Sequence, residues 1–320
     1  MPEVLETAKN VVEESRHVRI NHETLQRFSL ELAGQGTPTP SWDADHHFRG
    51  SDEETIAYLL VVDALNFCFW PPPGENKWEI VFKGKTYSGY YGLSVSLKKA
   101  IESRIPVTDA PFLASLTLKQ LENMFLGTGV LQLMVERLRN LQELGRVLLD
   151  KYNGQASELV AAAGGSAMKL VRMLAADFPS FCDQTTYRGR EVFFYKRAQL
   201  FAADLRGALG GKGLGNFSDM KELTACADYK LPQVLRHLEA FTYSSSLSEK
   251  VDRMIPLEAG SEEEVEIRAG TIWAVELMRR EMKHLGQEVT AGEIDWLLWN
   301  LGQQDRFRAK PYHRTVTTFY

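Results

Sequence analysis

A glycine-rich stretch in the second half of the chain separates two segments with helical periodicity. Apolar residues recur at helical spacing from about Tyr195 to Leu209. A second apolar run, from Leu231 to Phe241, has Pro232 in its first turn, where the missing N–H does no harm. Clustered glycines supply the positive-φ turns that end a helix, and here they are Gly210, Gly211, Gly213 and Gly215. The sequence therefore predicts two helices joined by a glycine-rich hairpin.

These glycines do not form either of the common phosphate-binding motifs. A Walker motif requires G-x-x-x-x-G-K-[ST], but Lys212 is followed by Gly213. The dinucleotide fingerprint follows a strand, whereas the segment before these glycines has helical periodicity. Neither a phosphate-binding loop nor a dinucleotide-binding fold is predicted.

Charged residues flank the glycine-rich stretch on both sides. Lys196 and Arg197 begin the first predicted helix, and Asp228 directly precedes the second. The positive end of a helix dipole favours a carboxylate, so Asp228 is predicted to stay ionised. Together these residues form a candidate small-anion site. The alternatives are a solvated basic face for Lys196 and Arg197 and a simple helix cap for Asp228.

A strong helix signal begins at Ser51. Ser51 and Glu54 have the spacing of a capping box, in which each side chain bonds the other residue's backbone N–H. The apolar run that follows predicts a helix through Trp70, ended by the prolines that begin at Pro71. Because it is apolar nearly all round, this helix is expected to be buried.

Two polar residues inside that apolar run need partners. Asp63 and Asn66 either satisfy backbone groups of neighbouring loops or line a pocket together with Phe67 and Trp70. In the second interpretation the aromatic faces stack on a planar ligand and the polar atoms orient it. For Phe67 and Trp70 taken singly, plain core packing is the alternative.

Most of the remaining chain is predicted to be helical. Alternation of apolar residues predicts a strand pair at 77–87, brief strand character appears at 185–192, and the stretch 34–40 is a loop. Helices are expected at residues 4–14, 22–33, 88–103, 117–126, 131–152, 155–176, 246–254, 262–285 and 290–302. No stretch is long enough for a flexible linker, so residues 1–50 are expected to pack on a main domain of residues 51–320.

Two features near the end of the chain have structural interpretations. Glu264, Arg268 and Glu276 lie at helical spacing, which usually indicates ion pairs within a helix. His313 and Arg314 belong to a short extended tail that is expected to dock onto the domain.

Composition narrows the function classes. The 320 residues are 44% hydrophobic and 25% charged, as in an ordinary globular protein, and the net charge of −5 argues against a broad nucleic-acid interface. Cys68, Cys182 and Cys226 share no C-x-x-C spacing, and only His46 and His47 are close together, so neither a metal nor another cofactor is expected. The chain has neither a signal-peptide pattern nor a long apolar stretch, so a cytoplasmic protein without membrane contact is predicted.

Several sequence blocks, taken together and in this order, resemble the queuosine salvage protein family. The blocks are DALNFCFWP (63–71), GKTYSGYYGL (84–93), FYKRAQ (194–199), ADYKLPQVL (227–235), EVEIRA (264–269) and a closing HR followed by Tyr320. The resemblance spans residue 50 to the end, with a looser match around Trp42 to Phe48. Members hydrolyse the N-glycosidic bond of queuosine 5′-phosphate and release queuine.

The resemblance implies a mostly α fold like that of DNA glycosylases, in which a helix-hairpin-helix unit brings a carboxylate, and in some members a lysine, to the sugar. Asp228 is the corresponding catalytic candidate and Lys196 the lysine. The stretch GKGLGNF departs from the DNA-binding hairpin consensus, and the chain is acidic. Both features favour a mononucleotide over a duplex.

The same resemblance suggests roles around the substrate. A carboxylate stabilises the positive charge that develops on the ribose, and whether Asp228 attacks the sugar or activates water stays open. Queuine is a 7-deazaguanine without N7, so its departure needs hydrogen bonds at other ring edges. The candidates for base contacts are Asp63, Asn66, Phe67, Trp70 and His47, those for the 5′-phosphate are Lys196 and Arg197, and Tyr229, His237 and Arg268 are second-rank.

Two rival functions stay open at this point. The first is a glycosylase acting on nucleic acid, and the second is a non-catalytic nucleotide- or base-binding protein. The favoured reading is a hydrolase with no polymer partner that yields queuine and ribose 5-phosphate for queuine salvage into tRNA. The oligomeric state is open, with a monomer favoured.

Overall fold

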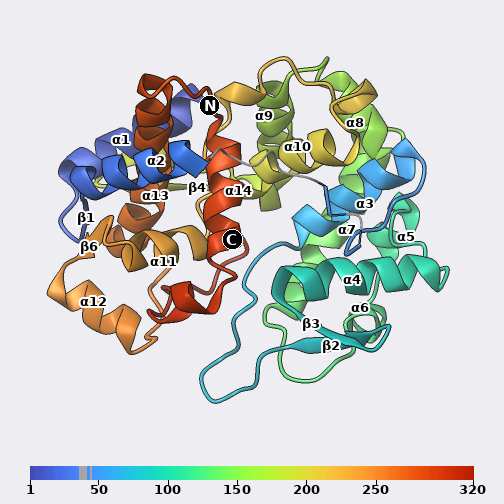
Figure 1. The fold of residues 1–320 in the computed structure, drawn as a ribbon. Helices are drawn as coiled ribbons and strands as arrows, with labels where there is room; N and C mark the ends of the chain where they lie inside the picture. The colour runs from blue at the N-terminus through green and yellow to red at the C-terminus, as the bar shows by residue number, and fades with distance from the viewer. Residues whose placement is uncertain (36–41, 44) are drawn as a thin grey trace.

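The computed structural model describes residues 1–35, 42–43 and 45–320, and most of them lie in helices (Figure 1). Of the predicted loop at 34–40, residues 36–40 lie outside the described residues, and residues 34 and 35 belong instead to the preceding helix. The α-helices are α1 Pro2–Glu14, α2 His22–Gln35, α3 Asp52–Ala64, α4 Gly89–Glu102, α5 Ala110–Ser115, α6 Leu118–Met124, α7 Met134–Lys151, α8 Ala156–Ala162, α9 Ala167–Asp177, α10 Lys196–Ala208, α11 Lys230–His237, α12 Ser245–Asp252, α13 Glu262–His284 and α14 Ala291–Leu301. Short 3₁₀ turns are η1 Pro179–Phe181, η2 Gly213–Gly215, η3 Met220–Glu222 and η4 Asp305–Arg308.

The strands form small antiparallel pairs. In the part of the chain that the structure describes, β1 Val18–Ile20 pairs with β6 Phe241–Tyr243, β2 Glu79–Phe82 with β3 Lys85–Ser88, and β4 Gln184–Tyr187 with β5 Arg190–Phe193. The second and third pairs confirm the predicted strand signals. The mostly helical fold class with a small β-hairpin is confirmed as well.

The first pair corrects the predicted end of the second helix. That helix ends at His237, because Glu239 turns the chain with φ 61° and the N–H of Ala240 bonds back to the carbonyl of Leu235 at 2.9 Å. Phe241 then pairs with Ile20. The apolar run continues across this turn, but its last residues serve a strand whose partner lies far away in the sequence.

The helix that starts at Asp52 also ends earlier than predicted. Its capping box is present, with Ser51 and Glu54 bonding each other's backbone N–H at 3.2 and 2.8 Å. It stops at Ala64 and does not reach Trp70, because Arg137 binds the carbonyls of Leu65, Phe67 and Cys68, groups that would otherwise continue the helix. Two further differences are the break at Gly164 and Gly165 between α8 and α9, and the unpredicted helix α5.

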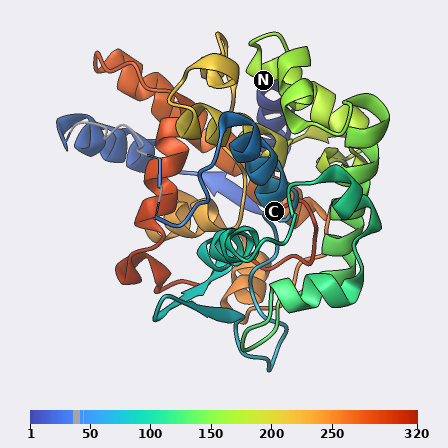
Figure 2. The same cartoon turned by 90° about the vertical axis from the view of Figure 1, so that its right-hand side faces the viewer.

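The described side chains bury two large hydrophobic cores. The first core gathers around α3, α4, α7, α9 and α10, and the second around α2, α11, α12 and α14. Helix α13 contributes to both, with Val265 in the first and Ile267 in the second. Figure 1 shows the two groups of helices side by side, with α1 against α13. In Figure 1 the C-terminus lies between the groups, and in Figure 2 it again lies near the middle of the molecule.

This division corrects the predicted helix hairpin. Helix α10 packs on α3 and α9 in the first core, whereas α11 packs on α13 and α14 in the second. The glycines do allow the predicted turns, since Gly210, Gly211 and Gly213 have positive φ. The segment between α10 and α11, however, runs through η2 and η3 and crosses from one core to the other. Residues that flank it therefore meet at the interface between the cores.

The N-terminal helix is tied to the rest of the chain. Glu3 pairs with Arg172 at 2.9 Å and Glu14 with Arg190 at 2.7 Å. Among the described helices, none is both long and apolar enough to cross a bilayer.

Candidate active site

Lys196 is the first residue of α10 and is almost fully buried, with 5% of its surface exposed. Its backbone N–H donates to Asp183 Oδ2 at 3.1 Å, and its Nζ donates to the carbonyl oxygen of Asn66 at 3.1 Å. Burial lowers the pKa of Lys196, and the nearby Asp228 and Asp63 carboxylates oppose that change. The ammonium is therefore held between α3 and the loop that precedes α11.

Asp228 lies just before α11 and is half-buried. Its Oδ1 accepts the backbone N–H groups of Lys230 at 2.7 Å and Leu231 at 3.0 Å. The predicted position at the start of a helix is confirmed. Burial raises the pKa of Asp228, while Lys196 and the two helix amides lower it, the amides in the direction that the sequence predicts. The carboxylate is oriented by the helix end, and its charge depends on Lys196.

Two further carboxyl groups at this interface escaped the sequence analysis. Asp204 of α10 accepts a hydrogen bond from the Tyr90 hydroxyl at 3.4 Å, and burial raises the pKa of Asp204 to about 7. Asp295 of α14 accepts the Cys226 N–H at 2.6 Å, and burial together with Asp228 raises the pKa of Asp295 to about 8. Both lie within apolar helical runs, the same signal that selected Asp63.

The carboxylate of Asp63 lies in the interior without a hydrogen-bond partner among the described residues. It is fully buried near the end of α3, and neither carboxylate oxygen has a partner with hydrogen-bond geometry among the described residues. Burial raises the pKa of Asp63 well above its ordinary value, and the Asp204 charge raises it further, while Lys196 and Arg197 lower it. The alternative in which Asp63 satisfies backbone groups of a loop is therefore wrong.

His47 connects to the same group of carboxyls. Its Nδ1 lies 3.2 Å from the Tyr58 hydroxyl and its Nε2 lies 3.3 Å from the Tyr90 hydroxyl, which itself bonds Asp204. Burial lowers the pKa of His47 to about 4, so the ring is neutral near neutral pH. His47 thus contacts the site through Tyr90 and supplies no positive charge there.

Arg197 is turned away from Asp228 into the first core. Its guanidinium donates to the carbonyls of Asp63 at 3.1 Å and Ala64 at 2.6 Å, and also to that of Ser180. Its fully buried position and these bonds secure the end of α3. The structure therefore separates Arg197 from Lys196, although the two are adjacent in sequence.

The aromatic candidates Phe67 and Trp70 pack in the interior. Phe67 is fully buried between two guanidinium groups, with Arg137 4.3 Å and Arg197 5.3 Å from its ring centre. Trp70 is 2% exposed, and Arg314 lies 5.4 Å from its ring centre. The core-packing alternative describes both contacts.

Most of the chain is similar to proteins of a known family. Residues 46–320 match the family described as queuosine salvage protein. A relative from Sphaerobacter thermophilus is 45% identical over 317 residues, covering 99% of this chain and 97% of its own length. The chain belongs to the queuosine salvage protein family.

Relatives from distant organisms extend the match. A protein from Mus musculus is 36% identical over 98% of both chains, and one from Schizosaccharomyces pombe is 30% identical over 98% of this chain and 94% of its own. All three relatives carry the name queuosine 5′-phosphate N-glycosylase/hydrolase. Similarity to members of the queuosine salvage family therefore includes nearly all of the first 50 residues as well.

The three remaining candidate residues lie in different places relative to Asp228. Tyr229 is half-buried beside Asp228, with its ring 4.8 Å from that of Tyr312. His237 lies at the other end of α11 against Phe307, at 4.9 Å between ring centres. Arg268 pairs with Asp183 beneath the site. The predicted docking of the C-terminal tail is confirmed, since His313 is buried.

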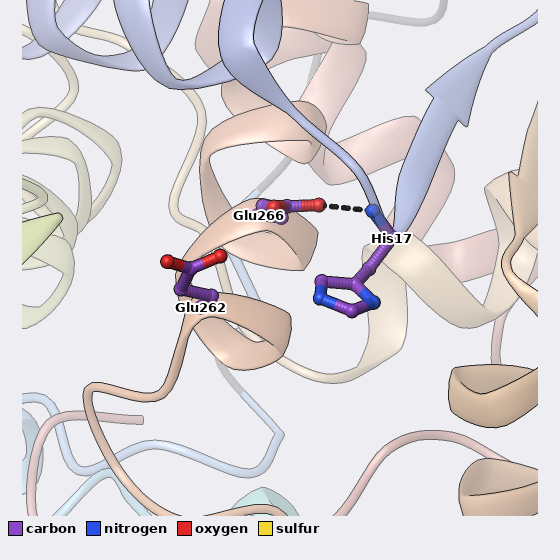
Figure 3. Close-up of side chains that lie close together, drawn as sticks. All are labelled: His17, Glu262 and Glu266. Atoms are coloured by element: carbon purple, nitrogen blue, oxygen red, sulfur yellow. Dashed lines mark hydrogen bonds between the residues drawn. The ribbon is translucent and has the colours of Figure 1, made fainter. Parts of the chain in front are cut away.

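A second cluster of ionisable groups resembles a metal site in composition only. Figure 3 shows His17, Glu262 and Glu266 close together on α13 and the segment before β1. Glu266 already accepts hydrogen bonds from the backbone N–H groups of residues 16–18, from the Ser15 hydroxyl and from the Tyr187 hydroxyl. Its oxygens are saturated with donors, so the carboxylate holds the chain in place.

Two cavities lie away from the interface between the cores. One, of about 20 Å³, is lined by residues of α1 and the β4–β5 hairpin, and the other, of about 130 Å³, by residues of α2 and α13. None of the candidate residues lines either cavity.

Proposed function

We propose that this chain hydrolyses the N-glycosidic bond of queuosine 5′-phosphate and releases queuine and ribose 5-phosphate. The observation that carries the proposal is that Lys196 and Asp228 lie near enough to shift each other's pKa, in a chain whose relatives are named for this reaction. Queuine released in this way is available for salvage into tRNA.

Asp228 is the proposed catalytic carboxylate. Cleavage of a ribosyl–nitrogen bond builds positive charge on the sugar, and a fixed anion stabilises that charge more than it stabilises the ground state. Because Oδ1 accepts the two helix amides, Oδ2 is the oxygen available to the ribose or to the attacking water. Lys196 supports the reaction by favouring the charged form of Asp228.

Neutral carboxyl groups suit the departing base. A 7-deazaguanine cannot accept a proton at position 7, so its leaving tendency depends on donors at other edges. The pKa of Asp295 is raised to about 8, so this carboxyl is mostly protonated near neutral pH, and that of Asp204 is raised to about 7, so this carboxyl is protonated in part. In the protonated form each can donate a hydrogen bond. Asp63, Asn66 and His47 are proposed to complete the base contacts, while Phe67 and Trp70 support them from the core.

The 5′-phosphate is proposed to lie against Lys196 and Lys230. Lys230 follows Asp228 by two residues and is half-buried. Among the described residues, its Nζ donates to two neutral oxygens, of Gln233 at 3.2 Å and Gly302 at 3.3 Å. Burial and the nearby Arg308 lower the pKa of Lys230 to about 8, which an incoming phosphate would reverse. Arg197 is not proposed to bind the phosphate, because its guanidinium is bonded to backbone carbonyls.

Broader assignments belong to the proposal as well. We propose a monomer that acts in the cytoplasm on a small-molecule substrate, with residues 1–50 forming a region packed on the domain of residues 51–320. Kinship with DNA glycosylases is proposed at the level of the Lys196–Asp228 pair. The three unpaired cysteines are consistent with a reducing compartment.

The decisive test is a comparison of substrates. Purified protein is incubated with queuosine 5′-phosphate, queuosine, guanosine 5′-phosphate and queuosine-containing tRNA, and released base is measured by chromatography. We expect queuine from the 5′-phosphate and much slower release from the others. Release from tRNA alone would favour the nucleic-acid glycosylase, and binding of queuosine 5′-phosphate without release from any substrate would favour the binding protein.

A further inference from the structure

A buried ion pair lies beneath the proposed catalytic residues. Arg268, in the middle of α13, donates to Asp183 Oδ1 at 2.9 Å and to Oδ2 at 2.7 Å. Asp183 precedes β4 and is 2% exposed, while Arg268 is 3% exposed. A bidentate contact of this kind fixes both the distance and the orientation of its partners.

The carboxylate of the pair reaches the start of α10. Asp183 Oδ2 accepts the backbone N–H of Lys196 at 3.1 Å. The carbonyl of Asp183 accepts the N–H groups of Phe194 at 3.0 Å and Tyr195 at 3.1 Å. Tyr195 has φ 51°, an unusual value for a residue with a side chain, and these bonds hold that turn. Asp183 thereby determines where the Lys196 side chain begins.

The guanidinium of the pair reaches the residue before Asp228. Arg268 Nε donates to the carbonyl of Ala227 at 3.2 Å. The guanidinium is enclosed by the rings of Phe194 at 3.9 Å and Tyr320 at 4.4 Å, and Glu264 Oε1 lies 3.7 Å from Nε. Arg268 therefore has no freedom to follow the Ala227 carbonyl if that loop moves.

We propose that Asp183 and Arg268 are positioning residues that set how far the Lys196 ammonium lies from the Asp228 carboxylate. The inference rests on the proposed function. Lys196 begins a helix of the first core, and Asp228 directly precedes a helix of the second core, while its neighbour Ala227 packs in the first core. The ion pair bonds the backbone N–H of Lys196 itself and the carbonyl of Ala227, the residue before Asp228, and so connects the two.

The proposal predicts a change in pH dependence that loss of packing alone would not cause. Lys196 lowers the pKa of Asp228. If Ala227 is released, Asp228 moves away from Lys196, its pKa rises, and the acid limb of kcat/KM moves to higher pH. The other ionisable groups that interact with Asp228 are Lys230 of α11, Asp295 of α14, Cys226 and Tyr229.

The test compares two arginines of the same helix. Arg268→Lys keeps the charge but loses the bidentate bond to Asp183 or the bond to Ala227. The control is Arg279→Lys, since Arg279 also makes a bidentate pair, with Glu276 at 2.7 and 3.0 Å, although its side chain is more exposed than that of Arg268. Asp183→Asn, which keeps an acceptor for Lys196 but removes the charge, is the second variant. The measurement is kcat and KM for queuosine 5′-phosphate across a pH series, with melting temperature as the fold check.

Arg268→Lys is expected to lower kcat by about 100-fold with little change in KM, as small misplacements of catalytic groups do. Its acid limb shifts to higher pH, Asp183→Asn shows a smaller change in the same direction, and Arg279→Lys matches the wild type. In Arg268→Gly, added guanidinium ion restores kcat and returns the acid limb to its original pH.

Two outcomes overturn the proposal. One is a folded Arg268→Lys or Asp183→Asn with wild-type kcat and acid limb. The other is a loss of kcat that only tracks the folded fraction, with an unshifted acid limb. If Arg268→Lys fails to fold, Asp183→Asn and the guanidinium rescue decide. Absence of queuine release by the wild type would instead sink the proposed function, so the two failures are distinguishable.

Discussion

Two groups of buried carboxylates in this protein differ in how their oxygens are used. Glu266, beside His17 and Glu262, accepts hydrogen bonds from three backbone N–H groups and two hydroxyls. At the interface between the cores, the carboxylate of Asp63 accepts no hydrogen bond from the described residues, and that of Asp228 accepts theirs through Oδ1. A saturated carboxylate contributes to stability, whereas an unsaturated one costs stability and has oxygens free for a substrate.

The strongest test of this contrast removes the Lys196 ammonium, which favours the charged form of Asp228. Lys196→Met preserves the length of the side chain but removes the ammonium that favours the charged form of Asp228. We expect kcat/KM to fall by about 1,000-fold, or roughly 4 kcal/mol of transition-state stabilisation. Circular dichroism and thermal melting should show a folded protein of similar stability. A variant with near wild-type turnover would contradict the role of Lys196.

For Glu266, whose oxygens are saturated with donors, we expect a substitution to lower stability and leave kcat unchanged. Glu266→Gln leaves backbone donors of residues 16–18 poorly paired, so the free energy of unfolding should fall by about 3 kcal/mol. The kcat of the molecules that remain folded should be unchanged. Urea denaturation and activity below the unfolding transition measure the two quantities. Loss of kcat without loss of stability would place Glu266 in the active site and break the comparison.

Substitutions of Lys230 and Arg197 test which cation contacts the 5′-phosphate, and we expect smaller effects from them. Lys230→Ala should raise KM for queuosine 5′-phosphate by about tenfold, because one charge-assisted contact to the phosphate is lost. The same change should leave KM for the nucleoside queuosine unaltered. Arg197→Lys is the contrasting variant, since we expect it to lower the melting temperature without a specific effect on KM for the 5′-phosphate. Equal effects on both substrates would rule out a phosphate contact.

Asp63 predicts the smallest effect and a pH dependence. Its pKa in the folded protein is raised above the ordinary value of 3.8, so the folded state binds a proton more tightly than the unfolded state. Stability from this group is thus complete below that value and is lost as pH rises toward the folded pKa. Asp63→Asn should therefore be more stable than wild type by about 1 kcal/mol at neutral pH, with the difference vanishing in acid. Melting curves at several pH values measure this, and a difference that grows in acid would contradict it.

Local patterns in the sequence were enough for much of the fold. The capping box at Ser51, the strand pair after Trp78 and the helix that begins near Lys196 all follow from short-range spacing. The ends of α3 and α11 did not follow, because each is determined by distant partners. Arg137 binds the carbonyls beyond Ala64, and Val18–Ile20 provides the strand that pairs with Phe241.

The candidate site shows the same limit. Asp228 and Lys196 were found from their places beside helix starts and from the family resemblance. Asp204 and Asp295 were missed, although each is a carboxylate in an apolar helical run, because the sequence does not show that α10 and α14 present them to the same interface. Arg197 was grouped with Lys196 because the two are neighbours in sequence, but the helix turns their side chains to different partners.

The role of Asp228 as the catalytic carboxylate is tested most directly by a paired experiment on Asp228→Asn. Binding of queuosine 5′-phosphate is measured by calorimetry, and queuine release is measured in single-turnover reactions. We expect binding within about threefold of wild type and a loss of release of about 1,000-fold or more, because a neutral amide cannot stabilise the positively charged ribose. Release at a wild-type rate with unchanged binding would show that the catalytic carboxylate is not Asp228.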